Sequence, residues 1–346
     1  MLDRSFSAAA VLGCLMLLPA CSSDSETGDR GNTGPEPELV APSNGFQLRT
    51  QGTMIEVSQD VEYCEIVKLP GTPDQEFYVT GYDIAMTDFS HHLIVSAILP
   101  DSEADRTFQE GEIHPCFGAQ DLAGLTQTTD VTGAQTPRIS YEYPEGIGKV
   151  FTGGQKLIFD YHYLNTSTAP VPARHAINFH TTEADQIDRI AQRLAFINLT
   201  IDTPPYSEGS FTGECSFDQD VMVGALTRHT HKWGTDFATW FAGGERDGEH
   251  IWTSTDYELD TLYSFDEPVL MRAGTGFRFQ CDYNNTTDRP LTFGEKATDE
   301  MCILFGLWWV VGENDPVTSQ FCVMTSTDDD GVSRGAKAIP DGFGSN

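Results

Sequence analysis

The feature that most limits the fold of this chain is a succession of short runs in which apolar and polar residues alternate. The runs are rich in valine, isoleucine, threonine, tyrosine and phenylalanine, and they include EFYVTGYDIAM from Glu76, QKLIFDYHYL from Gln155 and CILFGLWWVV from Cys302. A period of two is typical of strands that bury one face. The sequence therefore predicts an all-β fold of two tandem jelly-roll-like β-sandwiches. Helical spacing is best at residues 182–194, which predicts one or two helical turns there.

The first 42 residues do not follow this pattern. An apolar run from Phe6 to Leu18 leads into Leu18-Pro-Ala-Cys21, and it is too short for a membrane-spanning helix of ~20 residues. Small residues before a cysteine predict a bacterial lipoprotein signal peptide, residues 1–20, with cleavage before Cys21 and lipidation of its sulfur. An uncleaved membrane anchor is the alternative. We therefore expect a lipid-anchored protein of the bacterial cell envelope, at the outer membrane, that contacts the membrane through its lipid alone.

The remaining length predicts two domains. Residues 21–42 are mostly glycine, proline, serine and acidic residues, as expected for a flexible tether, and residues 326–346 are glycine- and aspartate-rich, which predicts a disordered tail. The chain between them is longer than one compact core usually serves, so we expect sandwiches at residues 43–196 and 197–325. Residues 153–166 and 274–286 each read as an aromatic strand with Asp-Tyr near its end and an Asn-Thr turn, which indicates a duplicated unit.

Acidic residues outnumber basic ones by 52 to 20, and the net charge is −32. This balance argues against nucleic acid and against anionic lipid headgroups as partners. The acidic residues are dispersed along the chain, which indicates a solvated surface. Charge therefore excludes partners without identifying a function.

Six cysteines remain once Cys14 and Cys21 are assigned to the signal peptide and the lipid: Cys64, Cys116, Cys215, Cys281, Cys302 and Cys322. Behind a secretory signal, an even number of cysteines predicts disulfides. The sequence contains no C-x-x-C pair, which argues against a thiolate zinc site or a thioredoxin-like redox motif. Spacing alone leaves the pairing open.

Two pairs of histidines could bind a metal. His229 and His231 are two residues apart, so on a strand their imidazoles share one face. His91 and His92 are adjacent and face opposite sides of a regular strand, so they can share a metal only where the strand ends or bulges. Each pair alone is explained equally well by exposed polar positions or by chance.

Four motifs in order make the pattern specific: SHHLIVSAIL from Ser90, FDYHYLN from Phe159, RHTHKWG from Arg228 and DEMCILFGLWW from Asp299. Over residues 45 to 325 the chain resembles the copper type II, ascorbate-dependent monooxygenases, the family of dopamine β-hydroxylase and peptidylglycine α-hydroxylating monooxygenase. The resemblance implies two copper ions per chain, one an electron donor and one that activates oxygen. The ligands implied for the first are His91, His92 and His162, and those for the second, the catalytic set, are His229, His231 and Met301.

The chemistry of the ligands agrees with this assignment. A thioether is a soft ligand that suits Cu(I), whereas three imidazoles serve both oxidation states of copper. Met301 alone would more often be core packing. The resemblance also implies three disulfides: Cys215 with Cys322, Cys281 with Cys302, and Cys64 with Cys116.

The activity implied is hydroxylation of a C–H bond with O2 and an external reductant, ascorbate or another donor. The peptide-amidating members have an arginine two residues before His-Thr-His, and this position is Thr227 here; Arg228 would face the other way. Their tyrosine and asparagine after the methionine are Phe305 and Ile303 here. We therefore expect a hydrophobic or neutral small molecule as substrate. The alternative is a non-catalytic copper-binding envelope lipoprotein for acquisition, storage or delivery, but two unlike ligand sets favour redox chemistry.

The other histidines lack partners at ligand spacing, so we expect surface or hydrogen-bonded positions for His114, His175, His180 and His250. Three Asn-x-Ser/Thr motifs, at Asn165, Asn198 and Asn285, are interpreted as turns.

Overall fold

A computed structural model describes residues 35–115, 127–255, 257, 262–294, 298–312 and 320–337. Nearly all regular structure in these residues is β, so the predicted fold class is confirmed. One short helix, α1 (Glu103–Thr107), was not expected; it is capped by Ser102, whose Oγ accepts from the Asp105 N–H at 3.0 Å. The predicted helical turn is a single 3-10 turn, η1 (Ala184–Gln186). No helix in the described residues is long and apolar enough to cross a membrane.

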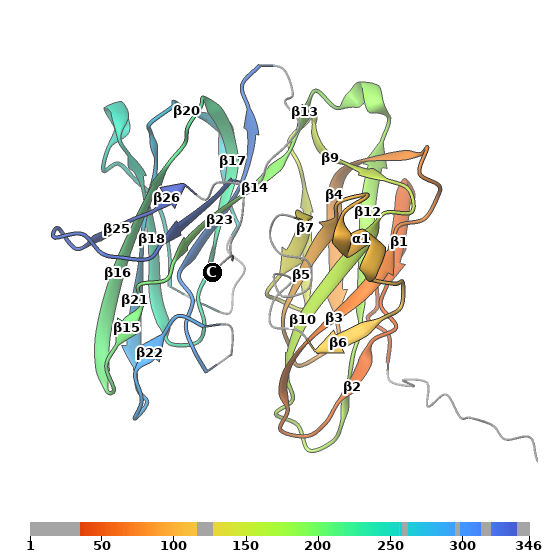
Figure 1. Cartoon of the computed structure of the whole chain (residues 1–346), viewed down its shortest axis with the longest axis horizontal. Helices are drawn as coiled ribbons and strands as arrows, with labels where there is room; N and C mark the ends of the chain where they lie inside the picture. Colours follow the sequence, from red (N-terminus) through yellow and green to blue (C-terminus); the bar gives the residue numbers. More distant parts are fainter. Residues whose placement is uncertain are drawn as a thin grey trace, which may run out of the picture. The chain divides into compact units, whose positions relative to one another are not determined.

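The N-terminal sandwich packs two sheets around one apolar core (Figure 1). The first sheet has the order β1 (Gly45–Arg49), β12 (His175–Thr182), β4 (Glu76–Met86), β9 (Ile147–Thr152) and β13 (Arg189–Ile190), with β8 (Arg138–Glu142) also paired to β4. The second has the order β6 (Ile113–Pro115), β3 (Asp60–Lys68), β10 (Lys156–Leu164), β5 (Ser90–Ile98) and β7 (Thr128–Ala134). A small sheet joins β2 (Thr53–Ile55) to β11 (Val171–Ala173).

The C-terminal sandwich is built in the same way. One sheet has the order β20 (Tyr263–Met271), β17 (Val221–His229), β23 (Ile303–Val310), β14 (Gln192–Asn198), β24 (Gln320–Met324) and β26 (Ala336–Lys337). The other has the order β19 (His250–Ser254), β18 (Gly234–Ala242), β21 (Gly276–Asn285), β16 (Ser207–Ser216) and β25 (Val332–Arg334). A small sheet joins β15 (Asp202–Thr203) to β22 (Leu291–Thr292). Among the described strands, no sheet mixes strands from before and after residue 191, so the predicted boundary at 196/197 falls inside β14.

Two disulfides cross the C-terminal core. Cys215 on β16 is bonded to Cys322 on β24, and Cys281 on β21 is bonded to Cys302, which precedes β23. Both pairs are those that the family resemblance implied, and each links one sheet to the other. Cys64 is also disulfide-bonded. Its predicted partner, Cys116, lies outside the described residues, as does Cys21.

The repeated Asn turns are one structural unit used twice. Asn165 follows β10, and its amide nitrogen donates to the carbonyls of Ile55, Glu56 and Ala169 at 2.9–3.1 Å. Asn285 ends β21, and its amide donates in the same way to Thr203, Pro204 and Arg289. In both, and in Asn198, the side-chain oxygen accepts from the N–H and the hydroxyl two residues later. These asparagines are buried, and the interpretation of all three motifs as turns is confirmed.

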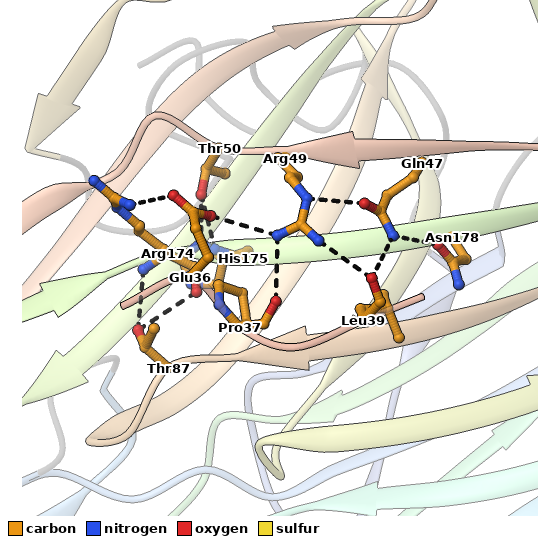
Figure 2. Close-up of polar contacts among 10 residues, drawn as sticks. All are labelled: Glu36, Pro37, Leu39, Gln47, Arg49, Thr50, Thr87, Arg174, His175 and Asn178. Atoms are coloured by element: carbon orange, nitrogen blue, oxygen red, sulfur yellow. Dashed lines mark hydrogen bonds and ion pairs between the residues drawn. The ribbon is translucent and has the colours of Figure 1, made fainter. Parts of the chain in front are cut away.

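Residues 36–40, predicted to belong to a flexible tether, are fastened to the N-terminal sandwich (Figure 2). Gln47 and Asn178 donate to the carbonyls of Leu39 and Val40, at 3.1 and 2.8 Å, and Arg49 donates to the carbonyl of Pro37 at 3.2 Å. The prediction is wrong for this part of the tether because polar side chains of the sheet hold its backbone in place.

The predicted disordered tail is also ordered in part. Strand β25 pairs with β16 and β26 pairs with β24, so disorder from residue 326 is wrong for residues 332–337. Arg334 forms ion pairs with Glu214, Asp328 and Asp330, which compensate the acidic composition of the segment. Gly335 lies directly over the Cys215–Cys322 disulfide: a Cβ here would come within 2.1 Å of the Cys322 sulfur.

Candidate functional site

Five of the predicted ligand histidines form one cluster. His91 and His92 begin β5, His162 lies near the end of β10, His229 ends β17, and His231 follows in the next loop. Ring centroids within each predicted set are 4.9–5.2 Å apart. The two sets adjoin, because His91 lies 5.4 Å from His231, and His92 lies 6.0 Å from His229, between ring centroids.

A β-bulge lets the adjacent histidines act together. Strand β10 pairs His162 with His92 and Tyr163 with Ser90, so His91 is the extra residue at the register shift. Phe89, just before, has a left-handed backbone with φ of 70°. The alternation is broken at this point, and the Nδ1 atoms of His91 and His92 lie 3.0 Å apart. Potential ligand atoms of His91, His92 and His162 lie within 4.8 Å of one another.

Carboxylates orient the rings of the first set. The Nε2 atom of His162 is 2.6 Å from Asp60 Oδ1, and its Nδ1 is buried without a partner. The hydrogen bond from His162 lowers the pKa of Asp60, so this carboxylate is ionised. His92 Nε2 faces Glu62 Oε1 at 3.6 Å. A metal-binding histidine usually donates its second ring nitrogen to a carboxylate or carbonyl, which is the arrangement seen at His162.

Backbone and side-chain contacts orient the second set. His231 Nδ1 lies 2.9 Å from the carbonyl of Asp299, and its Nε2 is buried without a partner. The carboxylate of Glu300 accepts from the backbone N–H of His231 at 2.9 Å and of Trp233 at 2.8 Å. The segment that contains Met301 is therefore tied to the His-Thr-His loop.

Met301 itself is half-buried and belongs to none of the apolar cores that the described residues form. Its carbonyl accepts from the Tyr283 hydroxyl at 2.7 Å. The next residue, Cys302, is fully buried. The chain thus enters the core after Met301, and the packing role that a lone methionine would suggest is not observed.

Burial keeps these imidazoles neutral. Burial, with a smaller contribution from neighbouring imidazoles, lowers the pKa of His91 to about 2 and that of His231 to about 4. The pKa of His229 is well below its ordinary value for the same reasons, burial first. A neutral imidazole has a free lone pair, which is the form that binds a metal ion. The cluster is therefore ready to accept metal at neutral pH.

Sequence reasoning missed the residues that orient the cluster: Asp60, Glu62, the Asp299 carbonyl and Glu300. Their only signal is proximity to the ligand motifs, and only Asp299 and Glu300 are inside one. The four remaining histidines lie outside the cluster, as expected: His114 is near Glu112, His180 bonds Asp83, His250 bonds Thr253, and His175 is buried between Thr50 and Tyr163.

The positions compared with the peptide-amidating enzymes are clear in the structure. Thr227 pairs with Phe305, and their side chains share the outward face of the sheet with His229. The Phe305 ring lies 6.4 Å from that of His229. Arg228 faces the other way, as predicted, and donates to Ser254 and Thr230.

A model of the copper type II ascorbate-dependent monooxygenase C-terminal domain matches residues 200–332, which contain the His-Thr-His loop and Met301. This part of the chain is similar to the C-terminal domain of the copper type II, ascorbate-dependent monooxygenase family. The matched residues lie in the C-terminal sandwich, and the imidazole nitrogens fit the copper of this family: His231 Nε2 in the matched part, and His162 Nδ1 in the N-terminal sandwich, are buried without hydrogen-bond partners.

Solved structures are similar only distantly. One described as PNGF-II is 9% identical; the similarity covers 82% of this chain and 66% of that chain, with a TM-score of 0.28. A structure of infectious bursal disease virus, Gt strain, is 11% identical over 81% of this chain and 85% of that chain, with a TM-score of 0.12. Similarity this low supports no conclusion about the copper monooxygenase fold or function.

Proposed function

We propose that this protein is a copper-dependent monooxygenase that hydroxylates a C–H bond of a small organic molecule with O2 and an external reductant. The observation that carries the proposal is the meeting of five histidines, drawn from both predicted ligand sets, in one cluster. One set is His91, His92 and His162, and the other is His229, His231 and Met301. Bound copper would supply electron transfer and oxygen activation at these residues.

The protein's own residues would tune each set differently. Asp60 holds the His162 ring with Nδ1 directed away from the carboxylate, so that nitrogen remains available to metal. Glu300 joins the loop of His231 to the backbone of Met301, whose thioether is the third ligand that we propose for the second set. Three imidazoles suit both oxidation states of copper, whereas a thioether suits Cu(I), so the two sets would give bound copper different redox preferences.

The location and the electron donor complete the proposal. The signal sequence and Cys21 support an envelope lipoprotein whose reductant is ascorbate or another small donor. A buried cluster also limits loss of reactive oxygen to solvent, because His92, His229 and His231 are each at most 6% exposed.

Removal of the thioether tests this function. Met301→Ala should retain copper at the three-histidine set and lose reductant-dependent oxygen uptake, because the second set loses its soft ligand. Copper per chain is measured by titration and elemental analysis, and oxygen uptake with ascorbate by electrode. Met54→Ala is the matched control, since Met54 lies exposed on β2.

Either of two outcomes contradicts the enzyme. Oxygen uptake could survive in Met301→Ala at the wild-type rate. Alternatively, both sets of the wild type could fill with copper and yet show no reductant-dependent turnover with any compound, which would favour the copper-binding lipoprotein.

A further inference from the structure

A cation lies on the face of the sheet that presents His229. Arg193 on β14 is two residues from Ala195, which pairs with Phe305 on β23, so Arg193 and Phe305 share that face. The guanidinium carbon of Arg193 lies 4.6 Å from the centroid of the Phe305 ring. The Phe305 ring also borders the site, since Phe305 and His229 are 6.4 Å apart between ring centroids. An arginine and an aromatic ring thus lie next to the second ligand set.

The charges around Arg193 do not balance. Asp130 on β7 accepts from Arg193 Nη1 at 2.5 Å and from Lys149 Nζ at 2.9 Å. Lys149 also donates to the carbonyls of Asp130 and Val131, so its ammonium uses three acceptors; burial lowers the pKa of Lys149, and Asp130 opposes this shift. Two cations therefore share one carboxylate, and their side chains are only 24% and 7% exposed. An excess positive charge in a poorly solvated position is costly unless an anion completes it.

One edge of the guanidinium is available to that anion. Asp130 occupies Nη1, whereas Nε is buried and has no hydrogen-bond partner. No residue in the described part of the chain accepts a hydrogen bond from Nη2. The Nε and Nη2 donors form one side of the planar fork, and this side can hold a carboxylate through two parallel hydrogen bonds.

We propose that Arg193 binds a carboxylate of the substrate, whose apolar body rests on Phe305 beside His229. This inference rests on the proposed function for the site it serves. It replaces the expectation of a neutral substrate, which followed from Thr227 in the position of the family's arginine. The anchor is on β14 instead, two strands away from Thr227 in the same sheet.

A purely structural role explains less. An ion pair with Asp130 would use only Nη1 of Arg193. The buried Nε, which has no hydrogen-bond partner, would then destabilise the fold through its lost hydration. A structural arginine would also affect folding and not the choice between a carboxylate and its neutral analogue. Ligand selectivity is therefore the property that separates the two roles.

The test uses the copper-loaded full-length mature protein and two probes of the same shape, 3-phenylpropionate and 3-phenylpropionamide. Binding is measured by isothermal titration calorimetry without reductant, so that turnover is not needed. The carboxylate should bind wild type about tenfold or more tightly than the amide, since hydrogen bonds between charged groups are about this strong. Arg193→Gln should abolish this preference and leave amide binding unchanged.

Two further variants make the result decisive. Arg189→Gln makes the same charge change four residues away, where the guanidinium donates to the Asp188 carbonyl, and should keep the preference. Arg193→Lys keeps the positive charge but not the planar guanidinium, so it should keep only part of the preference for the carboxylate probe. This variant also tests the proposal if circular dichroism shows that Arg193→Gln does not fold. Equal binding of the two probes to wild type, or an undiminished preference in both Arg193 variants, overturns the proposal.

The two proposals fail separately. Arg193-dependent carboxylate binding without any oxygen uptake would refute the monooxygenase and retain the anion site. Oxygen uptake stimulated equally by both probes would retain the enzyme and refute the anion site.

Discussion

One carboxylate decides which nitrogen of His162 can bind a metal. Asp60 is hydrogen-bonded to Nε2, and the lone pair for copper is therefore on Nδ1. Outer partners of this kind hold the ring in place and strengthen it as a ligand.

Asp60→Asn should lower copper affinity at the three-histidine set by about 10- to 100-fold, because a neutral amide polarises the ring less than a carboxylate does. Affinity is measured by competition with a chromophoric chelator under reducing conditions. Asp329→Asn makes the same change at an exposed position of the tail region and should have no effect. Equal copper affinity of Asp60→Asn and wild type would show that Asp60 does not orient a ligand.

Residues of the site differ in how visible they are in the sequence. Imidazoles are few, with nine histidines in the chain, so two close pairs and a single His in an aromatic strand could be singled out. Carboxylates number 52, and Asp60 or Glu62 looks like any surface residue until β3 is paired with β10. Arg193 was missed for the same reason, because its role depends on an aspartate 63 positions away that only the fold brings near.

Strands and bulges also differ in whether they could be predicted, because some depend on local sequence and others on pairing with distant strands. Strands were predicted because alternation is written locally in each run. The sequence showed only that His91 and His92 would need a strand end or a bulge to share a metal. The bulge itself arises from the register of β10 against β5, which the sequence does not reveal. Strands β25 and β26 were missed because the segment that contains them is rich in glycine and aspartate, and because they are held by pairing with β16 and β24, which lie earlier in the chain.

Gly335, between β25 and β26, leads to a prediction about the Cys215–Cys322 disulfide that it covers. In Gly335→Ala the added methyl group would meet both sulfurs of Cys215–Cys322, so the segment must shift, at a cost of about 1–3 kcal/mol. The disulfide should then be reduced by dithiothreitol several times faster than in wild type. Alkylation and mass spectrometry measure the rate, with Thr325→Ala as control in the same segment. An unchanged rate would mean that Gly335 does not shield the bond.

At the scale of the whole molecule, charge repulsion should set the response to salt. A net charge of −32 destabilises the compact state, and salt screens charges beyond a Debye length of ~10 Å at 0.1 M. Raising sodium chloride from 0.05 to 1 M should therefore raise the melting temperature by several degrees at pH 7. The increase should vanish near pH 4.3, the isoelectric point of the sequence. Differential scanning calorimetry measures both, and an equal increase at the two pH values would rule out charge repulsion as the cause.

Because residues 36–40 are bound to β1 and β12, the linker between Cys21, if it carries a lipid, and the folded protein is shorter than the predicted tether. The linker is then the 15 residues that follow Cys21, up to Glu36, and its fully extended length is ~50 Å. A lipid at Cys21 would thus confine the oxidation chemistry to a thin layer of space next to the bilayer. Molecules that collect at that surface would meet the enzyme far more often than those free in the bulk.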